Sequence, residues 1–274
     1  MTIEHGLTAP TRDVLLFFRA LADEPRLAIL RLLLVGDLRS SELGERLHLS
    51  TNKLAYHLKQ LRSLGLLRDH RSHADARDVY HRLDLDRLSS LYREAGDFLH
   101  PGLTSAMALT ARTEPDEGNA KKPNTQHPLR VLFLCTHNSA RSQLAEGILR
   151  RMGGNQVEAF SAGSEPTAVD PDAITVMQAL GIDPMLHTAK SLTTFAGQQF
   201  DYIITVCDRV RDVCPVFPGD PKQIHWSIAD PTLIEEPERR LAAFRATAHE
   251  LTTRIRYLLL LPHPATGERL QPRE

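Results

Sequence analysis

Cysteine and net charge are both scarce in this sequence. The chain has 274 residues and only three cysteines, Cys135, Cys207 and Cys214, all in its second half. So few thiols, and an odd number, exclude the disulfide framework of a small secreted protein and favour a reducing cytoplasm. A formal net charge of −1 excludes a uniformly basic nucleic-acid binder, so any contact with DNA must come from a local patch.

Long hydrophobic runs are also missing. The start "MTIEHGLTAP" has no basic segment followed by an apolar one, and apolar stretches are short, as in "YLLLLP" near the end. The sequence therefore predicts neither a secretion signal nor a membrane-spanning helix.

The length predicts two domains, because single cores usually run to about 100–200 residues. We place the boundary in residues 101–127, which are rich in Pro, Gly, Thr, Asn and Lys and carry little apolar periodicity. The expected parts are an N-terminal domain at 1–100, a linker at 101–127 and a C-terminal domain at 128–274. The stretch "LTSAMALTA" within this linker is also compatible with an extension of the preceding helix.

The first half is typical of a helical domain with one β-hairpin. A short helix at 41–47, the tight turn "HLS" and a second helix that opens at Ser50 or Thr51 and stops at Gly65 predict a helix-turn-helix. Two extended runs around a charged tip follow in "LLRDHRSHADARDVYHRLD", as a wing would have. Many small helical domains contain two helices joined by a turn, so these patterns leave DNA binding and a purely structural domain both open.

In order, the first half contains "SSELGERLHLSTNKLAYHLKQLRSLGLL" and then "VYHRL". This order of elements resembles the winged-helix repressors of the ArsR family, over roughly residues 11 to 100. The resemblance implies that the second helix enters the major groove, and that the N-terminal domain forms a homodimer on an inverted repeat of double-stranded DNA. The side chains expected at base edges are Ser50, Thr51, Asn52, Lys53, Tyr56 and His57, and those expected at phosphates are Lys59, Arg62, Arg68, Arg71 and Arg77.

No metal site is expected in this half. Arsenic-sensing members of the ArsR family hold the metalloid with cysteines, and residues 1–134 contain none, which excludes a trivalent arsenic site there because that ion requires soft thiolates. Zinc-sensing members use Asp and His on the last helix, where this chain has Asp84, Asp86, Asp97 and His100. Three carboxylates and one imidazole would bind a metal weakly, so a solvated helix face is the preferred interpretation.

The second half alternates strands and helices. Strands are predicted in "LRVLFLC", "VEAFSAG" and "FDYIITVC", and helices in "SQLAEGILRRMG", "PDAITVMQALG" and "PERRLAAFRATAHELTTRIRYLLLL". This order predicts an α/β domain with a parallel sheet flanked by helices. Ligands of such sheets bind beyond the carboxyl ends of the strands, which is where Cys135 stands.

The segment after Cys135 is typical of an oxyanion-binding loop. Its five residues can turn their backbone N–H groups inward at the start of a helix; they are Thr136, His137, Asn138, Ser139 and Ala140. We expect Cys135 to ionise readily and act as a nucleophile, and Arg141 to bind two oxygens of a tetrahedral oxyanion. Ser142 is expected to donate a hydrogen bond to the thiolate, and Asn138 to pin the loop. The competing interpretation is a small buried cysteine without chemistry.

Five motifs of the second half belong together: "CTHNSARSQLAEG", "SAGS", "GIDP", "FDYIITVCDRVRDVCPVFPG" and "HWSIADP". They resemble the low-molecular-weight protein tyrosine phosphatases, and within them the thioredoxin-coupled arsenate reductases, over roughly residues 129 to 262. The resemblance implies that Asp230 is the general acid or base, although an Asp-Pro pair by itself is typical of a turn. It also implies reduction of arsenate to arsenite by a relay through Cys135, Cys207 and Cys214, with thioredoxin as electron donor, no bound cofactor and weak phosphatase activity.

Two other functions stay open at this point. One is a tyrosine phosphatase tethered to a DNA-binding domain, with catalysis by Cys135, Arg141 and Asp230 only. The stretch "TLIEE" after the Asp-Pro pair speaks against it, because it lacks the tyrosines that line the phosphotyrosine groove of eukaryotic members. The other is a non-enzymatic repressor that senses arsenic or redox state through its thiols. Some relatives also bind potassium beside the loop, and here Lys190 occupies that neighbourhood, so its ammonium is expected to substitute for the ion.

Overall fold

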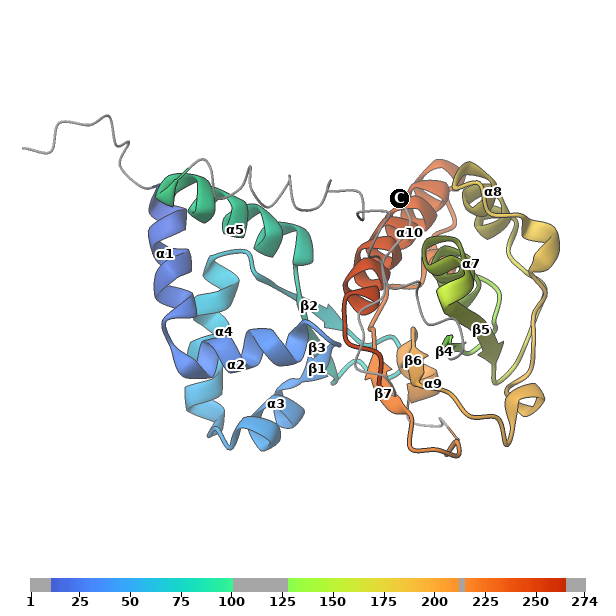
Figure 1. Ribbon diagram of the computed structural model, residues 1–274, viewed down its shortest axis with the longest axis horizontal. Coiled ribbons are helices and arrows are strands. Elements are labelled where there is room, and N and C mark those ends of the chain that lie inside the picture. Colours follow the sequence, from blue (N-terminus) through green and yellow to red (C-terminus); the bar gives the residue numbers. More distant parts are fainter. Residues whose placement is uncertain (1–10, 101–127, 212–214, 265–274) are drawn as a thin grey trace, which may run out of the picture. The chain divides into compact units, whose positions relative to one another are not determined.

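The computed structural model describes residues 11–100, 128–211 and 215–264, and Figure 1 shows their helices and strands. The linker predicted at 101–127 and the third cysteine, Cys214, lie outside these ranges. The described residues form two compact units. One contains 11–34, 39–69 and 81–100, and the other contains 128–211 and 215–264 together with the short segments 35–38 and 70–80.

The N-terminal half has the element order of a winged helix. Its elements are α1 (Arg12–Leu21), α2 (Glu24–Leu33), β1 (Leu38–Arg39), α3 (Ser40–Leu47), α4 (Thr51–Ser63), β2 (Leu67–Arg71), β3 (Val79–Leu83) and α5 (Leu85–Leu99). The three strands form a sheet in the order β1-β3-β2, so the wing consists of β2 and β3. The predicted helix-turn-helix with a wing is confirmed.

Local sequence explains where these helices begin and end. The side chains of Thr11, Asp23 and Asp84 accept hydrogen bonds from backbone N–H groups in the first turns of α1, α2 and α5. The turn between α3 and α4 contains His48 in the left-handed region with φ 51°, and the chain leaves α4 through Gly65 with φ 69°. The two helices therefore stop where the sequence predicts.

The C-terminal half is an α/β domain. Its main elements are β4 (Leu129–Cys135), α7 (Arg141–Gly153), β5 (Val157–Gly163), α8 (Pro171–Ala179), β6 (Tyr202–Thr205), α9 (Asp208–Arg211), β7 (Lys222–His225) and α10 (Pro237–Leu259). Its described residues also contain the 3₁₀ turns η1 (Gly154–Gln156), η2 (Pro184–Leu186), η3 (Leu192–Phe195) and η4 (Pro231–Leu233). Strand β7 was not predicted, because "KQIH" is short and half polar.

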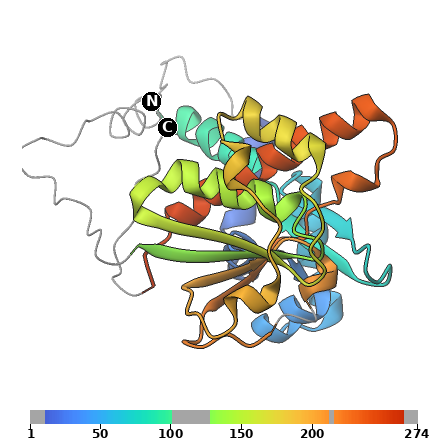
Figure 2. The same cartoon turned by 90° about the vertical axis from the view of Figure 1, so that its right-hand side faces the viewer.

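The four strands form one parallel sheet in the order β5-β4-β6-β7. The register pairs Cys135 with Gly163, Leu134 with Thr205, and Thr205 with His225. The carboxyl ends of all four strands therefore meet at one edge, which confirms the predicted parallel sheet. Figure 2 shows α7 and α10 on the same face of this sheet.

Apolar side chains from the strands and helices fill the core of this domain. Phe133 of β4, Leu144 of α7 and both Phe244 and Leu251 of α10 are fully buried. Burial of such a side chain stabilises a fold by roughly 1.5–3 kcal/mol, so this cluster fixes the sheet whose edge carries the site.

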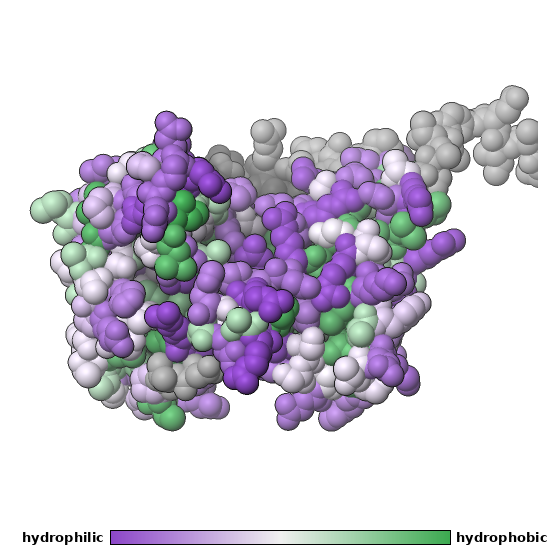
Figure 3. Space-filling view, turned by 180° about the vertical axis from the view of Figure 1, so that it is seen from behind, coloured by the Kyte–Doolittle hydropathy of each residue, from purple (hydrophilic) through white to green (hydrophobic). Residues whose placement is uncertain are grey.

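No helix among the described residues is long and apolar enough to cross a membrane. On the face drawn in Figure 3, hydrophobic residues lie in small groups among hydrophilic ones.

Candidate functional site

The loop after β4 surrounds the sulfur of Cys135 with hydrogen-bond donors. The backbone N–H of Asn138 donates to Sγ at 3.1 Å, and the Ser142 hydroxyl lies 2.8 Å from the same sulfur. Nδ2 of Asn138 also donates to the Ser142 oxygen at 2.9 Å, and between the Ser142 hydroxyl and the sulfur either atom can be the donor. Because Cys135 is only 3% exposed, these donors act on a sulfur shielded from water.

Asn138 and Gly163 hold this loop in shape. Asn138 is fully buried with φ 47°, and its Oδ1 accepts from the backbone N–H of Lys190 at 2.7 Å. At Gly163 the chain passes so close that a Cβ would lie 2.6 Å from the carbonyl oxygen of Thr136, so no other residue fits there.

The carbonyl groups of three loop residues accept backbone hydrogen bonds from the segment after β5. Those of Thr136, His137 and Ser139 accept from the backbone N–H groups of Glu165, Thr167 and Asp170, each at 2.9 Å. With these carbonyl oxygens occupied, the loop can present N–H groups to an oxyanion. The last loop residue, Ala140, is buried and directly precedes α7.

Arg141, the first residue of α7, contacts Asp230. One guanidinium nitrogen donates to Asp230 Oδ2 at 2.5 Å, and another donates to the carbonyl oxygen of Ile228 at 2.9 Å. The other carboxylate oxygen of Asp230 accepts from the backbone N–H and the hydroxyl of Thr232. The structure therefore brings together the arginine and the carboxylate that two separate motifs contributed.

The pKa of the Cys135 thiol is raised above its ordinary value. Burial is the main cause and negative charge at Cys207 adds to it, while Arg141 and the hydrogen bonds from Ser142 and Asn138 act in the opposite direction. The expectation of a readily ionised Cys135 is wrong for this arrangement of side chains. The physical reason is that burial outweighs the donors, and that Arg141 spends two of its N–H groups on other partners.

Cys207 lies close to the loop that carries Cys135. It follows β6, is 3% exposed and, like Cys135, is a free thiol. Its Sγ is 3.3 Å from Oγ1 of Thr136. A second thiol therefore reaches the residue next to Cys135. Cys214 lies outside the described residues, so its place in the relay stays a prediction.

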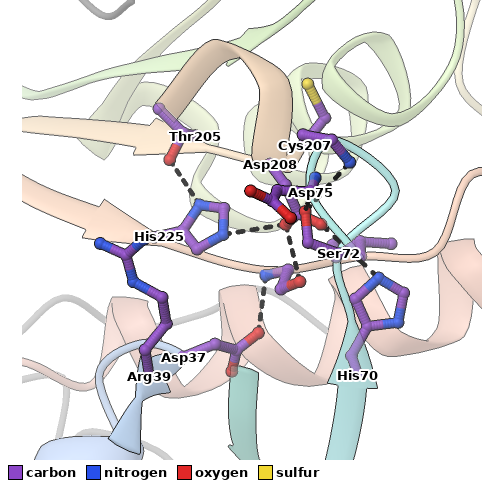
Figure 4. Close-up of polar contacts among 12 residues, drawn as sticks. Asp37, Arg39, His70, Ser72, Asp75, Thr205, Cys207, Asp208 and His225 are labelled. Atoms are coloured by element: carbon purple, nitrogen blue, oxygen red, sulfur yellow. Dashed lines mark hydrogen bonds and ion pairs between the residues drawn. The ribbon is translucent and has the colours of Figure 1, made fainter. Parts of the chain in front are cut away.

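Sequence patterns did not predict a buried polar cluster beside Cys207, which Figure 4 shows. It comprises Thr205, Asp208, His225 and Ser227, all buried. The available signal was that "CD" follows one strand and "HWS" begins at the last residue of another, and that parallel strands end at one edge. That signal was unusable without β7, because β7 carries the histidine.

Lys190, whose backbone N–H bonds to Asn138 of the loop, forms an ion pair with Glu146. Its Nζ lies 3.0 Å from Oε2 of the buried Glu146. Arg150 donates to the other oxygen of Glu146 at 2.6 Å, and the Ser161 hydroxyl also donates to this carboxylate. A cation of the protein itself thus pairs with the Glu146 carboxylate, which is linked to Asn138 through the Ser161 hydroxyl.

Most of the side chains expected at DNA bases point to solvent. Ser50, Thr51, Asn52, Lys53 and Tyr56 are exposed, as is Lys59 further along α4. The exception is His57, which is 9% exposed and whose Nδ1 lies 3.4 Å from Asp23. The expectation that His57 is exposed is wrong, because it lies on the helix face of the buried Leu54, Leu58 and Leu61.

The arginines expected at phosphates already have protein partners. Arg68 pairs with Asp84, Arg71 donates to the carbonyl oxygen of Ala76, and Arg77 pairs with Asp75. A phosphate would have to replace these acceptors.

Arg62 belongs to a network between the helices and the wing. Its Nε lies 2.9 Å from Asp69, whose other oxygen is 2.8 Å from Nδ1 of His81. Nε2 of His81 is 2.7 Å from the Ser40 hydroxyl. Although burial opposes it, the hydrogen bonds from His81 and Arg62 hold the pKa of Asp69 below its ordinary value. This network ties α3, α4, β2 and β3 together.

The acidic residues near α5 have structural contacts. Asp84 caps the helix by accepting from the backbone N–H of Arg87, and it pairs with Arg68. Asp86, Asp97 and His100 are exposed. Within the described ranges, no group of three or more His, Cys, Asp or Glu side chains is arranged to hold a metal ion.

Comparison with known proteins identifies the two halves. Residues 130–271 match the family described as low molecular weight phosphotyrosine protein phosphatase, and residues 23–69 match the bacterial regulatory protein, arsR family. An arsenate reductase of Halalkalibacterium halodurans is 36% identical over 127 residues, which are 46% of this chain and 91% of that protein. An arsenate reductase of Staphylococcus xylosus is 39% identical over 101 residues, which are 37% of this chain and 77% of that protein. A solved arsenate reductase from Archaeoglobus fulgidus is 28% identical with a TM-score of 0.38, covering 47% of this chain and 97% of its own. The chain therefore belongs to the low molecular weight phosphotyrosine protein phosphatase family and carries an arsR-family helix-turn-helix region before that domain.

Proposed function

We propose that residues 128–274 reduce arsenate to arsenite with the thiols of the chain, and that residues 1–100 bind DNA as an ArsR-type regulator. The observation that carries the first part is a second free thiol, Cys207, beside the loop that holds Cys135. A phosphatase needs only one thiol, whereas reduction of As(V) to As(III) consumes two electrons. The relatives named arsenate reductase support this choice.

In the first step the Cys135 thiol gives its proton to Asp230 and its sulfur attacks arsenate, so that an S–As bond forms and an As–O bond breaks. The loop N–H groups and Arg141 bind the oxyanion, and Asp230 protonates the oxygen that leaves as water. In the second step Cys207 attacks the sulfur of Cys135. The S–As bond breaks with its electron pair staying on arsenic, the proton of the Cys207 thiol passes to arsenite, and arsenite leaves as a Cys135–Cys207 disulfide forms.

The third step regenerates Cys135. Cys214 attacks Cys207, which frees Cys135 and leaves a Cys207–Cys214 disulfide for thioredoxin to reduce. No bound cofactor is needed, because thiols supply both electrons. The relay requires a reducing compartment, so we assign the protein to the cytoplasm.

Steady-state turnover of arsenate with thioredoxin, thioredoxin reductase and NADPH tests this proposal. The wild type is expected to oxidise NADPH in step with arsenite release, and Cys207→Ser and Cys214→Ser to lose this activity. As a matched control, both variants should still hydrolyse a small aryl phosphate slowly, because that reaction needs only Cys135, Arg141 and Asp230. If Cys214→Ser reduces arsenate as fast as the wild type, the proposed relay is wrong, and a tyrosine phosphatase tethered to a DNA-binding domain becomes the better assignment.

The arsR-family match supports the second function. We propose that the N-terminal domain forms a homodimer and binds an inverted repeat, with the exposed N-terminal residues of α4 at the bases. A shift assay on the promoter of its own gene, together with the molar mass in solution, tests this. A monomer without sequence preference would contradict it.

A further inference from the structure

A histidine bridges the two residues that flank the turn carrying Cys207. Nδ1 of His225 lies 2.8 Å from the hydroxyl of Thr205, and Nε2 lies 3.1 Å from Oδ1 of Asp208. Figure 4 shows the imidazole between these two side chains. Since Thr205 ends β6 and Asp208 begins α9, the ring closes a loop around Val206 and Cys207.

A second hydrogen bond holds Asp208 in place. Its Oδ1 also accepts from the Ser227 hydroxyl at 2.7 Å. Although burial opposes ionisation, the hydrogen bonds from His225 and Ser227 hold the pKa of Asp208 well below its ordinary value. A carboxylate only accepts hydrogen bonds, so Nε2 of His225 carries a proton toward it. A buried charge is costly unless its partners are in place, which makes this geometry specific.

Backbone hydrogen bonds hold the same turn from the other side. The N–H of Val206 donates to Leu134 at 2.8 Å, and the N–H of Trp226 donates to Thr205 at 2.9 Å. The Cys207 sulfur is thereby held 3.3 Å from Thr136 Oγ1. None of the phosphatase chemistry at Cys135, Arg141 and Asp230 uses these contacts.

We propose that Asp208 and His225 are positioning residues for Cys207. By fixing both ends of its turn, they aim the Cys207 sulfur at the Cys135 sulfur for the step in which the S–S bond forms and the S–As bond breaks. This proposal rests on the proposed arsenate reduction. It assigns to the cluster a role in the second step alone, and none in oxyanion binding or in attack by Cys135.

A single-turnover experiment in a Cys214→Ser background isolates that step. Arsenate is mixed with the reduced protein, and formation of the Cys135–Cys207 disulfide is followed by mass spectrometry. Misplacing a reacting group by about 1 Å costs up to about 100-fold in rate. His225→Phe and Asp208→Asn are therefore expected to slow disulfide formation about 10- to 100-fold, while kcat and KM for an aryl phosphate stay within about twofold of the parent. His225→Gln, which keeps a donor for Asp208, should lose less than His225→Phe.

Asp201→Asn is the matched control. The carboxylate of Asp201 also accepts a hydrogen bond from a backbone N–H, that of Arg130, at 2.8 Å. Asp201 precedes β6, however, and so lies at the opposite end of this strand from Cys207. It should leave disulfide formation unchanged. Thr205→Val removes only the bridge's hydrogen bond between Thr205 and His225 and leaves Asp208 and His225 in place. It should slow the same step, and it keeps the proposal testable if His225→Phe or Asp208→Asn does not fold.

Two results would overturn the proposal. One is disulfide formation at the parent rate in His225→Phe, Asp208→Asn and Thr205→Val. The other is a parallel loss of aryl phosphate hydrolysis, which would make the cluster part of the general scaffold. If instead the parent protein forms no disulfide and releases no arsenite, the proposed function fails rather than the role of the cluster.

Discussion

Arg141 and Asp230 are joined by a hydrogen bond that, under the proposed function, an oxyanion would have to replace. The guanidinium nitrogen that lies 2.5 Å from Asp230 is one that a tetrahedral oxyanion would use. Exchange of one acceptor for the other leaves Asp230 beside the bound oxyanion, where it can pass on the proton that it takes from the Cys135 thiol. The pairing thus preorganises two groups with a single contact.

The raised pKa of Cys135 predicts slow alkylation at neutral pH. At about pH 8.5 an ordinary cysteine is half ionised, whereas Cys135 should still be mostly protonated, so its reaction with iodoacetamide should have a midpoint above about 8.5. Cys207→Ser should move this midpoint down, because charge at Cys207 is one cause of the shift. Peptide mass spectrometry across the alkaline range measures both. A wild-type midpoint below that of free cysteine would contradict the prediction.

The Lys190–Glu146 pair predicts activity without potassium. Because Nζ of Lys190 already neutralises Glu146, arsenate turnover should be equal in potassium and sodium buffers. Lys190→Gln leaves a buried carboxylate short of a partner and should lower the free energy of unfolding by about 1–3 kcal/mol. Chemical denaturation measures this, with Lys222→Gln at an exposed position as the control. Potassium-dependent turnover of the wild type would count against it.

Helix α4 has one buried and one exposed face, and its cations differ in whether they form an ion pair within the protein. Lys53 and Lys59 are exposed, whereas Arg62 is held by Asp69 of the wing. A cation contributes to the salt dependence of DNA binding only if it gains a phosphate. The cations of this one element should therefore differ in effect.

Lys53→Ala should weaken DNA binding and reduce the slope of log affinity against log salt by about 1, as for one lost phosphate contact. Arg62→Ala should change the slope less, since Arg62 would first have to leave Asp69. Fluorescence anisotropy at several salt concentrations compares the two variants. Equal slopes for both would show that Arg62 exchanges Asp69 for phosphate.

At the scale of the whole molecule, any response of DNA binding to arsenite must run through the thiols. All three cysteines follow residue 134, and soft thiolates are what trivalent arsenic requires. The variant with Cys135, Cys207 and Cys214 all changed to serine should bind DNA equally with and without arsenite. A titration by fluorescence anisotropy checks this against the wild type. Release of the triple variant by arsenite would place the sensor elsewhere in the chain.

Local patterns in the sequence were enough to predict both folds and the loop around Cys135. The periods of apolar residues, the helix caps and the strand before the cysteine are properties of neighbouring residues, so they can be read without tertiary contacts. The prediction that His57 is exposed failed because it depends on a tertiary contact. A helix of mixed composition does not fix in its sequence which of its borderline side chains are buried, and packing of α4 against α2 buries His57.

The sequence by itself determined that a cysteine stands at the carboxyl end of a buried strand, followed by a loop, an arginine and a helix. Only the tertiary structure decided that Asp230 meets Arg141, 89 residues earlier, and that His225 bridges Thr205 and Asp208. It also decided that burial raises the pKa of Cys135. The physical reason is that these effects depend on which strands are neighbours in the sheet and on how much water reaches their ends. Neither property is local to any short stretch of the chain.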